Sequence, residues 1–104
     1  MLEINKNVFS FALQLKAGRA IVGWSQAELA ERSGVARPTV ARIEALMMQP
    51  RLDTVGKLKQ AFLDAGLQIL DGEPAGGFSL MVNGVALQAL LANKAAAPKG
   101  SDSE

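Results

Sequence analysis

Helix-ending residues divide the first two thirds of the chain into short segments with very short connections. Glycine closes apolar periodic runs at Gly23, Gly34 and Gly66, and Pro50 marks the end of the connection after the third run. A glycine just past a helix adopts the left-handed backbone that ends it, and a proline cannot continue a helix that has begun. These stop signals predict four helices within residues 8–66, a compact all-α unit in which the loops have two to six residues.

Cap residues and apolar spacing predict where the first two helices lie. The first runs from 8 to 24 with either Asn5 or Asn7 as its N-cap. The second covers 26–32, because Ser25-Gln26-Ala27-Glu28 has the form of a capping box, in which side chains and backbone N–H groups bond reciprocally.

Two further helices are predicted before Gly66. The third spans 37–46 and carries Pro38 in its first turn, where the missing N–H costs nothing. The fourth spans 53–65. Residues expected on the inward faces of the four helices or beside them are Phe11, Leu15, Arg19, Val22, Leu29, Ala30, Val35, Val40, Ile43, Val55, Leu58 and Phe62.

After Gly66 the apolar period changes from that of a helix to that of a strand. Residues 67–70 and 78–82 alternate on either side of a glycine-rich loop, which predicts a β-hairpin appended to the helices. The stretch 85–92 fits a strand after the Asn83-Gly84 turn signal, but its alanines and leucines favour a short helix. The composition of 93–104 predicts a disordered tail.

The small net charge of +1 hides an asymmetry along the chain. Residues 1–66 carry nine basic and six acidic side chains, whereas 67–104 carry two basic and four acidic ones, so the first part favours polyanionic partners. Histidine, cysteine and tyrosine are absent, and we therefore expect no enzyme, no metal and no cofactor. The chain has no apolar run of membrane-spanning length and no secretory signal, so we expect a cytoplasmic protein that does not enter membranes.

The segment from Leu15 to about Leu70 resembles the Cro/C1-type helix-turn-helix family of phage and bacterial regulators. The resemblance implies a lambda-repressor-like fold of four to five helices over 8–66, with the two-helix motif at 26–45. The residues that carry it are Arg19, Gly23-Trp24-Ser25-Gln26, Glu28-Leu29-Ala30, Gly34-Val35, Thr39-Val40, Arg42-Ile43-Glu44 and Pro50-Arg51-Leu52-Asp53-Thr54-Val55.

The same resemblance implies that the helix starting at Arg37 enters the major groove of double-stranded DNA. Arg37 is expected to read a guanine, and Pro38 offers an apolar surface to a thymine methyl. Thr39 and Arg42 are expected to contact bases or phosphates on adjoining parts of that face.

Phosphate contacts are expected at the start of the preceding helix, where Ser25 and Gln26 meet the positive end of the helix dipole. Ser25 equally fits a plain helix cap. Arg51 is the only cation in the loop that follows Glu44. The resemblance also implies an internal ion pair between Arg19 and Glu44, which belongs to the architecture and not to the DNA contacts.

Two departures from the family pattern predict weaker phosphate binding. Ala36 stands where a capping Ser or Thr is usual, and the loop at 45–49 lacks the usual glycine and cations. The Leu46-Met47-Met48 run in that loop is predicted to be tucked onto the core, with an adaptable partner surface as the alternative.

The leading functional hypothesis is a DNA-binding transcriptional repressor that acts as a homodimer on a palindromic operator. The alternative is an antitoxin similar to the HipB group, which binds a toxin protein and regulates its own operon. A helix-turn-helix used only for protein contact is disfavoured by Gln26, Arg37 and Arg42. Residues 67–92 are the expected dimerisation extension, with an apolar face that would pack on a second copy, made of Leu67, Ile69, Phe78, Leu80, Val82 and the stretch 85–91.

Overall fold

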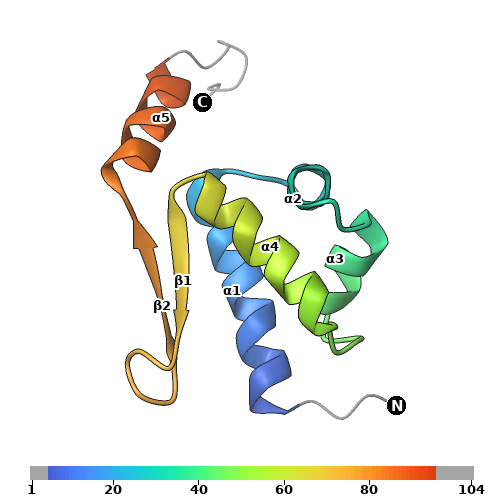
Figure 1. Ribbon diagram of the computed structural model, residues 1–104. Helices are drawn as coiled ribbons and strands as arrows, with labels where there is room; N and C mark the ends of the chain where they lie inside the picture. Colours follow the sequence, from blue (N-terminus) through green and yellow to red (C-terminus); the bar gives the residue numbers. More distant parts are fainter. Residues whose placement is uncertain (1–4, 96–104) are drawn as a thin grey trace.

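The computed structural model describes residues 5–95, which form five helices and one two-stranded antiparallel sheet (Figure 1). In the view of Figure 1, α4 crosses in front of α1, the motif helices α2 and α3 lie to the right, and the hairpin lies to the left. This confirms the predicted all-α helix-turn-helix fold with a short β-hairpin. In chain order the elements are α1 (Lys6–Val22), α2 (Gln26–Ser33), α3 (Arg37–Glu44), α4 (Leu52–Asp64), β1 (Leu67–Asp71), β2 (Phe78–Val82) and α5 (Gly84–Ala95).

The ends of α1 and α2 follow the local signals in the sequence. Asn5, and not Asn7, caps α1, because its side-chain oxygen accepts from the backbone N–H of Val8 at 2.9 Å. Gly23 then ends α1 with φ 77°. The Ser25 hydroxyl caps α2 by accepting from the N–H of Glu28 at 3.0 Å. The Glu28 carboxylate bonds to Arg32 instead of reaching back, so only half of the predicted capping box forms.

The end of α3 differs from the prediction. The helix stops at Glu44, two residues early, because Leu46 adopts the left-handed region with φ 63°. The N–H of Leu46 then bonds to the carbonyl of Ile43 at 3.1 Å, and that of Met47 to the carbonyl of Arg42 at 2.8 Å, so the last carbonyls of the helix are satisfied. A leucine in this conformation costs about 1–2 kcal/mol that a glycine would not.

The aromatic ring of Phe62 occupies the centre of the core. It stacks on Trp24 with the ring centroids 5.5 Å apart, and α1 approaches it closely at Gly18, where an added Cβ would lie 2.9 Å from the ring. The guanidinium of Arg32 covers the outer face of Trp24 at 4.5 Å. The other members of this core are Phe11, Leu15, Val22, Leu29, Ala30, Val35, Val40, Ile43, Leu58, Ala61 and Leu67.

The hairpin packs its apolar face against this same core, whereas its expected part in joining a second copy stays a prediction. The register pairs Leu67 with Val82 and Ile69 with Leu80, so these four side chains share one face. Leu67 is fully buried in the core, and the other three pack against it. The face is therefore covered within the chain, and Phe78 beside it is half-buried.

Helix α5 follows the hairpin and projects away from the other helices (Figure 1). This agrees with the preferred helical interpretation of 85–92, and it places residues 93–95 in the helix and not in the predicted tail, whose remainder lies outside the described residues. The Asn83 side chain accepts from the N–H of Ala86 at 2.8 Å, and Ala86 is buried against Gly66. Among the large apolar side chains of its first two turns, Leu90 is half-buried, whereas Val85, Leu87 and Leu91 are exposed at 78%, 58% and 62%.

Candidate nucleic-acid interface

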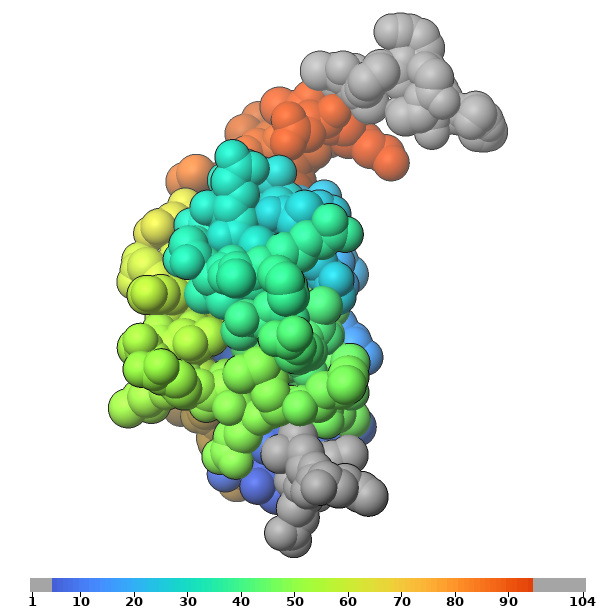
Figure 2. Space-filling view, turned by 90° about the vertical axis from the view of Figure 1, so that its right-hand side faces the viewer, coloured from blue at the N-terminus to red at the C-terminus, as the bar shows by residue number. Residues whose placement is uncertain are grey.

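The turn between α2 and α3 fixes the crossing of the two motif helices. Gly34 ends α2 with φ 79°, and only three residues separate the helices. The inward faces are buried as predicted, by Leu29 and Ala30 from α2, Val35 from the turn, and Val40 and Ile43 from α3. The rest of α3 faces outward on the surface toward the viewer in Figure 2, below α2 and above the start of α4. The motif therefore presents one helix on the outside of the domain, as groove recognition requires.

The outward face of α3 carries two arginines with no carboxylate partner. Arg37, at the first turn, and Arg42, at the last, are both exposed. Within residues 5–95, no acidic side chain lies at salt-bridge distance from either guanidinium. Pro38 is exposed between them and Thr39 is half-buried. Both guanidinium groups are therefore free to bond to an external acceptor.

The two residues predicted at the phosphate contact differ in how they lie. Ser25 is exposed, and its hydroxyl caps α2, which agrees with the alternative prediction that this serine is a plain helix cap. Gln26 is half-buried, and its amide nitrogen donates to the Glu44 carboxylate at 3.1 Å. The Gln26 side chain is therefore oriented by the ion pair behind it, a contact that the sequence analysis missed.

The loop between α3 and α4 brings one cation to the edge of this face. The side chain of Arg51 is 83% exposed and lies 3.6 Å from the Asp53 carboxylate, which is itself 60% exposed. An exposed pair of this kind holds its partners weakly, so Arg51 remains available to a phosphate. The run Leu46-Met47-Met48 was predicted either to pack on the core or to offer a surface to a partner. Met48 packs against the core, whereas Met47 is 67% exposed.

The predicted ion pair behind the motif is present. Arg19 donates to both carboxylate oxygens of Glu44 at 2.7 Å and to the carbonyl of Trp24 at 3.1 Å. Burial acts to raise the pKa of Glu44, but the hydrogen bonds from Arg19 and Gln26 and the charges of Arg19 and Lys16 outweigh it and lower that pKa. The hydrogen bond to Glu44 raises the pKa of Arg19. The pair ties α1 to α3 and fixes the angle at which α3 is presented.

Other kinds of site find little support in the described residues. Within 5–95, no group of three His, Cys, Asp or Glu side chains gathers to hold a metal ion. None of the helices there is both long and apolar enough to cross a membrane.

The fold is that of a helix-turn-helix domain, a kind of domain that binds DNA. Comparison with known families agrees: the model described as helix-turn-helix matches residues 15–62. Residues 15–62 are therefore a helix-turn-helix domain of the Cro/C1 type, as the sequence resemblance implied. No curated protein and no solved structure matches the chain.

Proposed function

We propose that this protein is a sequence-specific repressor of transcription, cytoplasmic, that binds a palindromic operator in double-stranded DNA as a homodimer. The observation that carries the proposal is the pair of exposed, unpartnered guanidinium groups of Arg37 and Arg42 on the outward helix of a Cro/C1-type domain. The resemblance implies that this helix enters the major groove. There, arginine can donate two hydrogen bonds to a guanine, the commonest specific contact between protein and DNA.

The contacts divide into base-reading and phosphate-binding ones. Arg37 reads a guanine in each half-site, Pro38 lies against an apolar base edge, and Thr39 and Arg42 contact the neighbouring base or backbone. Ser25, Gln26 and Arg51 bind phosphates beside the groove. With Ser25 engaged as a cap and Arg51 beside Asp53, we expect a shallow salt dependence, equivalent to about 4–6 phosphates per dimer.

Binding of fluorescent duplexes, followed by anisotropy, separates the two kinds of contact. Arg37→Ala is expected to cost about 1–3 kcal/mol on the cognate site and much less on random DNA. Gln26→Ala should weaken binding to both duplexes equally, because a phosphate carries no base identity. Lys94→Gln, on exposed α5, removes a charge away from the motif and serves as the control once sedimentation shows that its oligomeric state is unchanged. An equal loss on both duplexes for Arg37→Ala would assign that arginine to the backbone.

For the homodimer we infer an interface on α5, since the hairpin face is already covered. Leu87 and Leu91 are four residues apart, lie on one side of the helix and are exposed at 58% and 62%. A helix that exposes its leucines in this way is stabilised when a second copy covers them. Sedimentation should show a dimer for the full chain and a monomer for the Leu87→Lys/Leu91→Lys variant. Gln88→Lys/Asn93→Lys adds the same charge and should stay dimeric.

The antitoxin function is the second candidate, and the same exposed leucines favour it. An antitoxin must offer a surface to a different protein, and α5 offers one outside the DNA-binding motif. If the full chain sediments as a monomer at every concentration, the homodimer is wrong and α5 is left open to a different protein partner. A dimer abolished by the leucine substitutions assigns α5 to the homodimer.

A further inference from the structure

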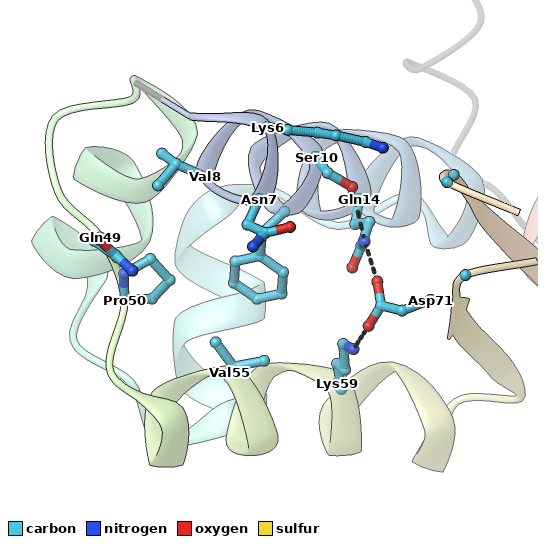
Figure 3. Close-up of a pocket in the computed structure, with 14 residues that line it drawn as sticks. Lys6, Asn7, Val8, Ser10, Gln14, Gln49, Pro50, Val55, Lys59 and Asp71 are labelled. Carbon is cyan, nitrogen blue, oxygen red and sulfur yellow. Dashed lines mark hydrogen bonds and ion pairs between the residues drawn. The ribbon is translucent and has the colours of Figure 1, made fainter. Parts of the chain in front are cut away.

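A pocket of about 380 Å³ lies between α1, α4 and the hairpin loop, apart from the outward face of α3 (Figure 3). In Figure 3, Lys6, Ser10 and Gln14 approach it from α1, Val55 and Lys59 from α4, and Asp71 from the end of β1. The loop residues Gln49 and Pro50 close the side opposite Asp71. The volume is within the range of small-molecule sites.

The floor of the pocket is apolar. Val8 and Phe11 are buried residues of α1, 2% and 7% exposed, and Val55 and Pro50 are half-buried opposite them. Polar and charged side chains line the rest of the pocket, so it offers an apolar surface and polar groups to one organic molecule.

One wall is built from a polar network whose hydrogen bonding is incomplete. The Gln14 amide nitrogen donates to Asp71 at 2.8 Å and to the Ser10 hydroxyl at 3.3 Å, and Lys59 pairs with the other oxygen of Asp71. Gln14 is 2% exposed, and its carbonyl oxygen has no partner among the described residues. The bonds among Gln14, Ser10, Asp71 and Lys59 therefore hold this wall in place.

The charge of the lining sets the class of ligand. Two lysines and one carboxylate line the pocket, and Lys59 is the cation that Asp71 neutralises. Lys6 has no carboxylate partner within residues 5–95, and its ammonium lies at the hairpin loop, 3.3 Å from where a Cβ on Gly76 would be. A ligand that fits has an apolar body for the floor and one negative charge for Lys6.

We propose that this pocket binds a small monocarboxylic acid with an apolar or aromatic body. The body lies on Val8, Phe11 and Val55, and the carboxylate pairs with the ammonium of Lys6. The ligand would contact α1, α4 and the hairpin loop together, because all three line the pocket. The proposal does not depend on DNA binding and rests only on the lining of this pocket.

Titration of the full chain with phenylacetate, followed by backbone amide NMR, tests the site. We expect saturable shifts at Ser10, Gly72, Gly76 and Gly77, and little change in α5. Phenylacetamide, which has the same body without the charge, should bind at least about fivefold more weakly, as should phenylacetate to Lys6→Gln. Asn7→Trp fills the pocket from an exposed position and should abolish the shifts.

Lys94→Gln removes an exposed lysine from α5 and should bind phenylacetate as the unmodified chain does. The proposal is overturned if the shifts fail to saturate, if they spread over exposed lysines throughout the molecule, or if phenylacetamide binds as tightly as phenylacetate. Undiminished binding to Lys6→Gln or to Asn7→Trp, each checked for an unchanged helical spectrum, would also overturn it.

Discussion

Arg19→Met removes the cation that holds α1 against the recognition helix and leaves its partner in place. The Arg19 guanidinium makes two 2.7 Å hydrogen bonds to Glu44, whose side chain is only 4% exposed. In the variant, the Glu44 carboxylate keeps a single side-chain donor, Gln26 at 3.1 Å, and water scarcely reaches it. Methionine preserves much of the aliphatic packing of arginine, so the loss reports mainly on the unpaired charge.

The expected cost is about 3 kcal/mol, at the lower end of the range for breaking a buried pair, because Gln26 continues to donate. A chain of this size has about 5–15 kcal/mol of stability, so the urea midpoint should fall by roughly 20–60%. Glu44→Gln should cost less, about 1–2 kcal/mol, because the Arg19 side chain is 21% exposed and its guanidinium can be hydrated.

Urea unfolding followed by far-UV circular dichroism and by the fluorescence of Trp24, the single tryptophan, measures both losses. Arg19→Met/Glu44→Gln should lose less than the sum of the two single changes, because no unpaired charge remains. The penalty of Arg19→Met should also shrink as the pH falls, because the unpaired Glu44 then accepts a proton. A cost below about 1 kcal/mol for Arg19→Met, or additive effects in the cycle, would refute the coupling.

Four further predictions concern the helices and their electrostatics. Gly18→Ala should destabilise by about 1–3 kcal/mol, because its Cβ would lie 2.9 Å from the Phe62 ring. In the same denaturation assay Gly56→Ala, with open space around an exposed helical position, should stabilise by about 0.5–1 kcal/mol. Leu46→Gly should be more stable than Leu46→Ala by about 1 kcal/mol, since both remove the side chain but only glycine accepts φ 63° freely; equal stabilities would contradict this. The lowered pKa of Glu44 means that the unfolded chain takes up its proton first, so the free energy of unfolding should fall below about pH 4.5 and fall less steeply in Glu44→Gln.

The sequence predicted well those features that depend on neighbouring residues. Asn5, Ser25 and Gly34 act within one turn of their own helix, so the helix boundaries near them follow from local chemistry. The pair between Arg19 and Glu44 is distant in sequence, and it was predictable only because the family resemblance supplied the partner.

Features that depend on packing between distant segments were missed or wrong. Period-two alternation showed that Leu67 and Ile69 share a face, but it could not show that the face packs on the helices of the same chain. The early end of α3 depends on Leu46, a residue that gives no stop signal. Gln14 did give a signal, since a polar residue three positions after Phe11 falls on the inward face of α1 and has to find partners there.

Selection of bound duplexes from a random DNA pool tests the central claim, that α3 reads a base sequence through Arg37. The full chain should enrich a palindrome whose half-sites are centred one helical turn apart, about 34 Å, or a multiple of it, with a guanine conserved in each half. Arg37→Ala should enrich the same palindrome with that guanine relaxed. No enrichment by the full chain, or an unchanged guanine preference in Arg37→Ala, would contradict the account.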